Sequence, residues 1–208
     1  AKISSYSFST KDDHAAVQIT NIQADPFVSV EYNQQVVQSQ LVGIYNANNI
    51  NAAITIGHYF KVSDTLIVKA IENYNPTNNR SQLSKKDSNQ LILDAYNANP
   101  SSMSVALANF IQLPEPNKVA FLGDMFELGN ESFQEHKMIV ESLQKELKIQ
   151  FYFIGSEFYK CKIEQDNFMF FNSFEDLMKA LSATKFENKY ILIKGSRWIA
   201  LERIVELL

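Results

Sequence analysis

Residues 1–42 contain short runs in which apolar and polar positions alternate, the pattern of β-strands buried on one face. These runs cover residues 15–19, 27–32 and 36–42. Between them, Asp25-Pro26 and Asn33-Gln34 are typical of turns. The spacing predicts a small antiparallel meander.

The pattern changes to helical spacing after Gly43, where two amphipathic segments follow one another. The first covers residues 49–60 and the second residues 64–74, with Ser63 placed to cap the second. Their apolar faces are Ile50, Ala53, Ile54 and Gly57, then Leu66, Ile67, Ala70 and Ile71. Residues 75–79 predict a linker, so we expect one domain over residues 1–78 and another over 79–208.

Strands and helices alternate along the second half of the chain. Strands are expected at residues 90–94, 118–123, 151–155, 167–171 and 190–193. Helices are expected at residues 102–111, 131–147, 173–182 (capped by Ser173) and 198–208. Near-continuous apolar strands between amphipathic helices are typical of a parallel sheet covered on both faces. The sequence therefore predicts an α/β class: a Rossmann-like open, mostly parallel sheet, preceded by the small meander and two helices.

Composition narrows the possible functions. The 208 residues include 19 Lys and Arg and 23 Asp and Glu, a net charge of −4, without the basic block that nucleic-acid binding requires. No apolar run approaches the roughly 18 residues of a membrane span. Cys161 is the single cysteine, so we expect a free thiol in a reducing cytoplasm. We also expect the protein to be a monomer. The chain begins at Ala1 without a signal-peptide core, which suggests a processed product or a piece of a longer chain.

Polar residues and glycines follow four of the predicted strands. They are Asp94, Gly123-Asp124, Gly155-Ser156-Glu157 and Lys194-Gly195-Ser196-Arg197. Ligands of open parallel sheets bind at the carboxyl ends of the strands, so these residues predict a site at one edge. Lys194 and Arg197, before a predicted helix, are suited to an anion, although the spacing is not that of a Walker phosphate loop. The alternative is that these loops are polar only because their backbone is solvated.

Three further residues are candidates for binding. Asn46 and Asn49 share a helical face, and their carboxamides can both donate to and accept from the edge of adenine. The alternative for this pair is a helix cap and a solvated amide. Arg80 follows the linker and can equally be a solvated arginine. The three histidines show no metal-ligand spacing; they are His14, His58 and His136.

Four segments together resemble motifs of the Mur ligase family. Residues 43–53 resemble its Gly-x-His-Asn-x-x-Asn-x-x-Ala-Ala segment, although Tyr45 stands where the family commonly has histidine. Residues 94–100, Asp-Ala-Tyr-Asn-Ala-Asn-Pro, are similar to an Asp-Ser-Tyr-Asn-Ala-Asn-Pro motif. Residues 123–129, followed by His136, resemble Gly-Asp-Met-x-Glu-Leu-Gly…His, and residues 194–197 match Lys-Gly-Ser-Arg. The motifs keep their order over about residues 40–203.

The resemblance implies part of an ATP-dependent amide-bond ligase of peptidoglycan precursor synthesis. Within the family it points to the member that joins D-alanyl-D-alanine to UDP-N-acetylmuramoyl-tripeptide through an acyl phosphate. Residues 1–78 would be the last part of the central ATP-binding domain, and residues 79–208 the C-terminal domain. The family's phosphate loop, Mg²⁺ ligands and carbamylated lysine have no counterpart here, so no catalytic or metal-binding residue is assigned.

The resemblance also assigns binding roles by position. Asn46 and Asn49 would lie beside adenine, Arg80 would reach the nucleotide phosphates, and Asp94 would accept the ribose hydroxyls. The proposed substrate-binding residues are Tyr96, Asn97, Asn99, Lys194 and Arg197, the last two facing an anionic group. Asp124, Glu127 and His136 belong to a motif without an assigned role.

Two alternatives stay open at this point. The chain could be a stand-alone, non-catalytic nucleotide- or peptide-binding module with Mur ligase architecture. It could also belong to another ligase of the superfamily, such as one acting on folate, although Asn97-Ala98-Asn99-Pro100 argues against this. We expect the isolated chain to be unable to catalyse the ligation.

Overall fold

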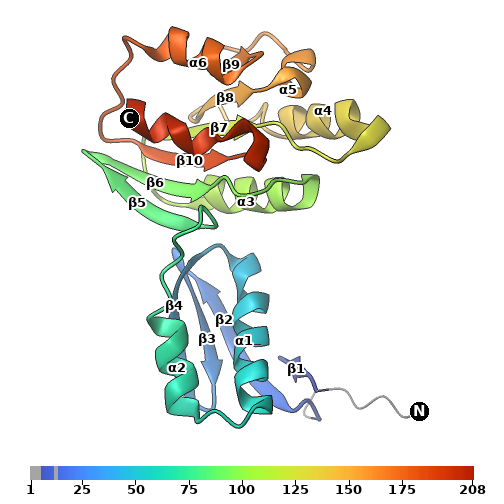
Figure 1. The fold of residues 1–208 in the computed structure, drawn as a ribbon, viewed down its shortest axis with the longest axis vertical. Helices are drawn as coiled ribbons and strands as arrows, with labels where there is room; N and C mark the ends of the chain where they lie inside the picture. Colours follow the sequence, from blue (N-terminus) through green and yellow to red (C-terminus); the bar gives the residue numbers. More distant parts are fainter. Residues whose placement is uncertain (1–5, 12–13) are drawn as a thin grey trace. The chain divides into compact units, whose positions relative to one another are not determined.

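The computed structural model describes residues 6–11 and 14–208 and divides the chain into two compact units. The N-terminal unit is Ala1–Pro76 and the C-terminal unit is Thr77–Leu208 (Figure 1). The division falls within residues 75–79, the segment expected to be a linker. Each unit has its own sheet, so each is described by itself.

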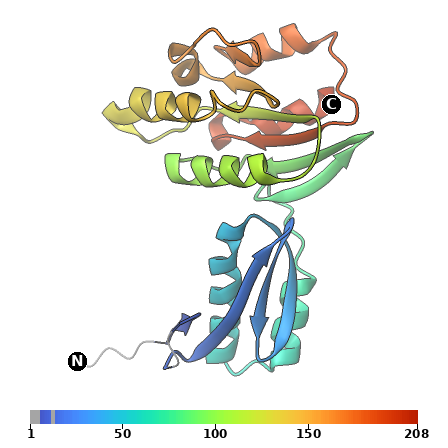
Figure 2. The same ribbon diagram turned by 180° about the vertical axis from the view of Figure 1, so that it is seen from behind.

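The N-terminal unit contains a four-stranded sheet in the order β1-β2-β3-β4. Strands β2 (Val17–Ala24), β3 (Phe27–Tyr32) and β4 (Gln35–Val42) form the expected antiparallel meander. The short β1 (Phe8–Ser9) was not expected and pairs with β2 in parallel. Helices α1 (Ala47–Tyr59) and α2 (Asp64–Glu72) cover one face, and Figure 2 shows the strands in front of both.

Alternation along the strands explains how this unit packs. Val28, Val30 and Tyr32 of β3 are buried, as are Ile50 and Ile54 of α1, in one apolar cluster. The cluster joins the inner face of the meander to both helices through Ile50, Ile54 and Ile67, as predicted, but Ala53, Leu66 and Ala70 of the predicted apolar faces are exposed.

Ser63 caps α2 differently from the prediction. Its backbone is extended at the N-cap position, but its side chain makes no capping hydrogen bond. Instead, its carbonyl oxygen accepts the N–H groups of Leu66 and Ile67. The first residue of the helix, Asp64, accepts hydrogen bonds from Tyr32 Oη at 2.6 Å and from Asn33 Nδ2 at 2.7 Å. The sequence predicted where α2 begins, but not that the Ser63 carbonyl oxygen, Tyr32 and Asn33 form the hydrogen bonds at its first turn.

The C-terminal unit contains a six-stranded sheet in the order β5-β6-β10-β7-β8-β9. All neighbouring strands are parallel except β5 and β6, which confirms the mostly parallel α/β sheet. The strands are β5 (Gln82–Lys86), β6 (Asn89–Asp94), β7 (Lys118–Gly123), β8 (Gln150–Ile154), β9 (Phe168–Phe171) and β10 (Tyr190–Lys194).

Helices cover both faces of this sheet. Figure 2 shows α3 (Pro100–Gln112) and α4 (Ser132–Ser142) on one face, and Figure 1 shows the C-terminal segment on the other. On that second face, α6 (Phe174–Leu181) and the C-terminal segment pack on alternate residues of the strands, such as Ile191 and Ile193. Ser173 caps α6 by accepting the N–H of Asp176, as predicted.

The prediction of a terminal α-helix over residues 198–208 is wrong. The segment forms two 3₁₀ helices, η3 (Arg197–Ile199) and η4 (Leu201–Leu207), separated by Ala200 at φ 50° and ψ 49°. Leu201, Ile204 and Leu207 recur every third residue, which is the repeat of a 3₁₀ helix. Leu201 and Ile204 are buried against the sheet, so packing selects this period.

Five other differences concern short or polar elements. Helix α4 ends at Ser142 instead of continuing to residue 147, and the 3₁₀ helix η2 (Gly129–Glu131) precedes it. Strand β5, helix α5 (Ser156–Lys160) and the 3₁₀ helix η1 (Ile44–Asn46) were not expected.

Candidate functional site

The candidate site of the C-terminal unit lies at the carboxyl ends of its parallel strands. Asp94 ends β6, Gly123 ends β7 and Lys194 ends β10, so the parallel pairing brings these residues to one edge. Strand β5 runs the opposite way, with Gln82 opposite Leu93, so the residues that precede β5 also lie at this edge. This pairing explains how Arg80 comes close to the ends of β6 and β10.

Asp94 and Lys194 form an ion pair across neighbouring strands. They are direct register partners, and Lys194 Nζ lies 2.6 Å from Asp94 Oδ2. The Lys194 side chain is 2% exposed and the Asp94 side chain 14%. The backbone N–H of Ser81 donates to the other carboxylate oxygen, Asp94 Oδ1, at 3.2 Å. The carboxylate is thus fixed on both oxygens by groups from two other segments.

Tyr96 lies beside two arginines. The Arg80 guanidinium carbon is 3.9 Å from the centre of the Tyr96 ring, and the corresponding Arg197 distance is 5.5 Å. Both arginine side chains are exposed, and neither forms an ion pair with a residue that the structure describes. Two exposed guanidinium groups on one tyrosine are suited to a carboxylate or phosphate group.

Asn97 and Asn99 lie in the loop between β6 and α3, and both are exposed. Asn99 is the N-cap of α3: its Oδ1 accepts the N–H of Ser102 at 2.8 Å, and Ser102 Oγ accepts the N–H of Asn99. Asn97 Oδ1 accepts the N–H of Ala98 at 2.9 Å. The amide oxygens therefore stabilise the loop itself.

Asp124, at the end of β7, holds the start of α5. Its carboxylate oxygens accept the N–H groups of Glu157 at 3.0 Å and of Phe158 at 2.9 Å. Burial raises the pKa of the Asp124 carboxyl, and these two N–H groups oppose that shift. Gly155 is part of the same arrangement, because a Cβ atom on it would lie 2.2 Å from the carboxyl group.

His136, which the sequence places among charged residues, is completely buried. Its Nε2 accepts the N–H of Met125 at 3.0 Å, while its Nδ1 lies 2.7 Å from the carbonyl oxygen of Ser132. A ring that donates from Nδ1 and accepts at Nε2 is neutral. His136 thus anchors the loop after β7 to helix α4.

Ser196 connects three of the strand-end loops. Its N–H donates to the carbonyl oxygen of Asp124 at 3.2 Å, and its Oγ accepts the N–H of Phe126 at 3.2 Å. The same Oγ donates to the carbonyl oxygen of Ala98 at 3.5 Å. The loops after β6, β7 and β10 are therefore joined by one side chain.

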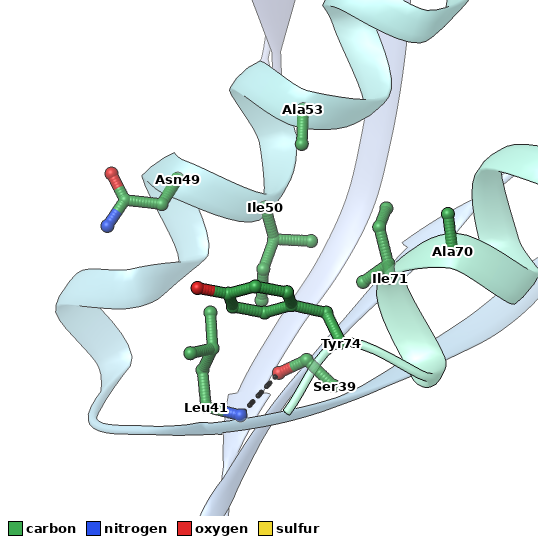
Figure 3. Close-up of a pocket in the computed structure, with 8 residues that line it drawn as sticks. All are labelled: Ser39, Leu41, Asn49, Ile50, Ala53, Ala70, Ile71 and Tyr74. Carbon is green, nitrogen blue, oxygen red and sulfur yellow. Dashed lines mark hydrogen bonds between the residues drawn. The ribbon is translucent and has the colours of Figure 1, made fainter. Parts of the chain in front are cut away.

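The N-terminal unit contains a separate cavity of about 340 Å³ between β4, α1 and α2. Figure 3 shows the Tyr74 ring near the centre of the lining side chains. The lining is almost entirely apolar and consists of Ser39, Leu41, Asn49, Ile50, Ala53, Ala70, Ile71 and Tyr74. Asn49 is exposed, and its Nδ2 donates to Asn46 Oδ1 at 3.0 Å. The buried Asn46 donates from its own Nδ2 to the carbonyl oxygen of Val42 at 2.8 Å and makes no capping bond.

Residues 79–197, more than half of the chain, match the family model described as "Mur ligase, glutamate ligase domain". The chain belongs to the Mur ligase family.

Relatives within the Mur ligase family extend the similarity over most of the chain. The UDP-N-acetylmuramoyl-tripeptide–D-alanyl-D-alanine ligase of Bacillus subtilis is 30% identical, over 97% of this chain and 46% of that ligase. A crystal structure of MurF from Acinetobacter baumannii has a TM-score of 0.81 at 26% identity, covering 97% of this chain and 46% of that chain. The chain thus spans about half the length of the relatives it matches.

A third comparison concerns the fold alone. MurF from Thermotoga maritima in complex with ADP has a TM-score of 0.72 at 18% identity, covering 96% of this chain and 47% of that chain.

Sequence reasoning missed one residue of the candidate site, Ser81, and the contacts of another, Ser196. Ser81 gave no signal, because its position at the edge depends on the polar strand β5. Ser196 was visible as the third residue of Lys-Gly-Ser-Arg, but its three hydrogen bonds join segments far apart in the sequence.

Among residues 6–11 and 14–208, no three His, Cys, Asp or Glu side chains are grouped so that they could hold a metal ion. No helix in the described part of the chain is long and apolar enough to cross a membrane.

Proposed function

We propose that this chain is the C-terminal part of an ATP-dependent ligase that adds D-alanyl-D-alanine to UDP-N-acetylmuramoyl-tripeptide. In this proposal, residues 1–78 belong to the central ATP-binding domain and residues 79–208 form the C-terminal domain of a cytoplasmic monomer. The observation that carries it is the 30% identity to the Bacillus subtilis ligase over 97% of the chain. The cluster of cations around Asp94 and Tyr96 adds physical support.

The proposal assigns nucleotide-binding residues within each unit separately. Asn46 and Asn49 bind the adenine side, and the apolar cavity beside Asn49 has the size and lining expected of a site for a flat base. Asp94 accepts the ribose hydroxyls, since a carboxylate is an acceptor-only group. Arg80, exposed beside Tyr96, binds the phosphate groups.

The remaining exposed groups at the sheet edge are proposed to bind substrate. Arg197 lies against Tyr96 and binds an anionic substrate group, while Tyr96 and Asn97 face the acyl phosphate or the incoming dipeptide. Asn99 is assigned to the same loop, and its Oδ1 also caps α3, so its Nδ2 is the group proposed to donate to substrate. In catalysis these residues bind and orient the reactants and exclude water, which would hydrolyse an acyl phosphate.

Mg²⁺ is implied by ATP-dependent phosphoryl transfer. The described residues provide no group of carboxylates fitted to hold it, so none is assigned and no step is derived through the metal.

The test is a ligation assay on the gene product that carries this chain. We expect ATP-dependent formation of the tripeptide–D-alanyl-D-alanine product, with phosphate release that requires both acceptor and donor. Asp94→Ala is expected to raise the KM for ATP, whereas substitution of the exposed Asp166, away from the strand ends, leaves it unchanged. ADP binding without any turnover would support a non-catalytic binding module instead, and activity of the 208-residue chain alone would contradict the assignment of catalysis to groups outside it.

A further inference from the structure

We propose that Lys194 is a positioning residue that fixes the Asp94 carboxylate for the ribose hydroxyls, and does not itself contact the anionic substrate. This inference rests on the proposed nucleotide role of Asp94. It replaces the direct substrate contact that the sequence suggested for Lys194.

Burial is the first observation. Only 2% of the Lys194 side chain is exposed, so its ammonium group has almost no surface to offer a ligand. It lies on β10 in the middle of the sheet, between β6 and β7. Arg80 and Arg197 differ in this respect, because both are exposed at the same edge. An anionic ligand at this edge would therefore contact Arg80 and Arg197 and not Lys194.

The ion pair is the second observation. A buried ammonium group is tolerated when it is paired with an opposite charge, and Lys194 Nζ lies 2.6 Å from Asp94 Oδ2. The strand register places the two residues directly opposite each other, so the pair depends on the central part of the sheet and not on a loop. Lys194 can thus hold the carboxylate in one orientation.

The remaining acceptor capacity of Asp94 is the third observation. Its Oδ1 accepts the N–H of Ser81 at 3.2 Å, and its Oδ2 accepts from Lys194. A carboxylate has about four acceptor positions, so two donors leave roughly two free for a pair of hydroxyl groups. The side chain is 14% exposed, which gives a ligand access to it. Lys194 and Ser81 together determine which lone pairs face outward.

The test compares ADP with 2′,3′-dideoxy-ADP, using the 208-residue chain and NMR titration to measure both dissociation constants. If Asp94 binds the ribose hydroxyls, the unchanged chain prefers ADP by roughly tenfold to a hundredfold. In Lys194→Met we expect this preference to fall to within about threefold, while the affinity for dideoxy-ADP stays the same. In an Asp94→Asn background, Lys194→Met should have no further effect on the preference.

The exposed Lys185 supplies the matched control, since Lys185→Met removes the same charge away from the strand ends and should retain the preference. If Lys194→Met weakens both nucleotides equally and keeps the preference for ADP, Lys194 contacts the ligand's anionic part and the inference is wrong. If the unchanged chain binds both nucleotides equally, or binds neither, the proposed role of Asp94 in binding the ribose hydroxyls is wrong, and the inference about Lys194 is wrong with it. Should Lys194→Met not fold, Lys194→Arg takes its place: it moves the donors relative to Asp94, so a lowered preference supports the inference and an unchanged one contradicts it.

Discussion

Replacing Asp124 by alanine removes the carboxylate that joins the end of β7 to the start of α5. In the structure this carboxylate is 2% exposed and accepts the N–H groups of Glu157 and Phe158. Helix α5 has only five residues, so its first N–H groups have few other ways to be satisfied. We therefore expect Asp124→Ala to destabilise the C-terminal unit.

The expected loss follows from the two hydrogen bonds. A hydrogen bond to a charged group contributes about 1.5–3 kcal/mol, and donors left buried without an acceptor cost a similar amount. The burial that raises the pKa of Asp124 offsets part of this gain. We expect a net loss of about 3 kcal/mol, a large share of the roughly 5–15 kcal/mol that stabilises a typical domain.

Urea unfolding followed by circular dichroism measures this loss, and amide hydrogen exchange locates it. With m values of about 1–3 kcal/mol/M, the midpoint should fall by roughly 1–3 M, and the Glu157 and Phe158 amides should lose protection. Asp166→Ala, at an exposed position, is the control and should change the stability by less than about 0.5 kcal/mol. An Asp124→Ala chain with an unchanged midpoint and protected Glu157 and Phe158 amides would refute the argument.

Three further predictions concern single side chains. Gly155 has φ 124°, and a Cβ atom on it would lie 2.2 Å from a buried carboxyl group, so Gly155→Ala should lower the unfolding free energy by about 2–4 kcal/mol. Gly129 has φ 55° and no atom near the position of a Cβ, so Gly129→Ala should lower it by only about 1 kcal/mol. Equal losses in urea unfolding would contradict the steric argument. Burial raises the pKa of the Cys161 thiol to about 11 from its ordinary 9.0, so alkylation of this thiol at pH 8 should be roughly a hundredfold slower in the native chain than in urea. Similar rates would show that the thiol is not protected. Tyr32→Phe removes the hydrogen bond that lowers the pKa of Asp64, and it should lower the unfolding free energy by about 1 kcal/mol at pH 7. Because this hydrogen bond favours the ionised carboxylate, the difference in stability between the two chains should persist down to about pH 3.8 and disappear below it. A difference that grows in acid would contradict this assignment.

Strong periodicity made most of the fold predictable. The meander, the two N-terminal helices and the five strands β6 to β10 have apolar patterns that predict their type, although Leu66 and Ala70 on the predicted apolar face of α2 are exposed. Strand β5 could not be found in this way, because Gln82–Lys86 is mostly polar and lies at the edge of the sheet. The terminal segment, predicted as a helix over residues 198–208, forms 3₁₀ helices instead, and its apolar residues recur every third position, a spacing that also fits one face of an α-helix.

The candidate site was predictable where it depends on the ends of strands. Asp94 and Lys194 end two neighbouring parallel strands, so the sequence could place them at one edge. Their mutual ion pair, the burial of Lys194 and the bond from Ser81 depend on the order of strands in the sheet, which the sequence did not give. Asn99 shows the same difficulty, because a residue in a binding motif also caps a helix.

The most direct test of the central claim is a titration of the ¹⁵N-labelled 208-residue chain with ADP, followed by amide chemical shifts. The account predicts saturable shifts at Arg80, Asp94 and Tyr96 and at Asn46 and Asn49, with little change at the opposite end of the C-terminal sheet, around Asn188. No saturable shift at these residues, or shifts confined to residues around Asn188, would contradict the assignment of the strand ends to nucleotide binding.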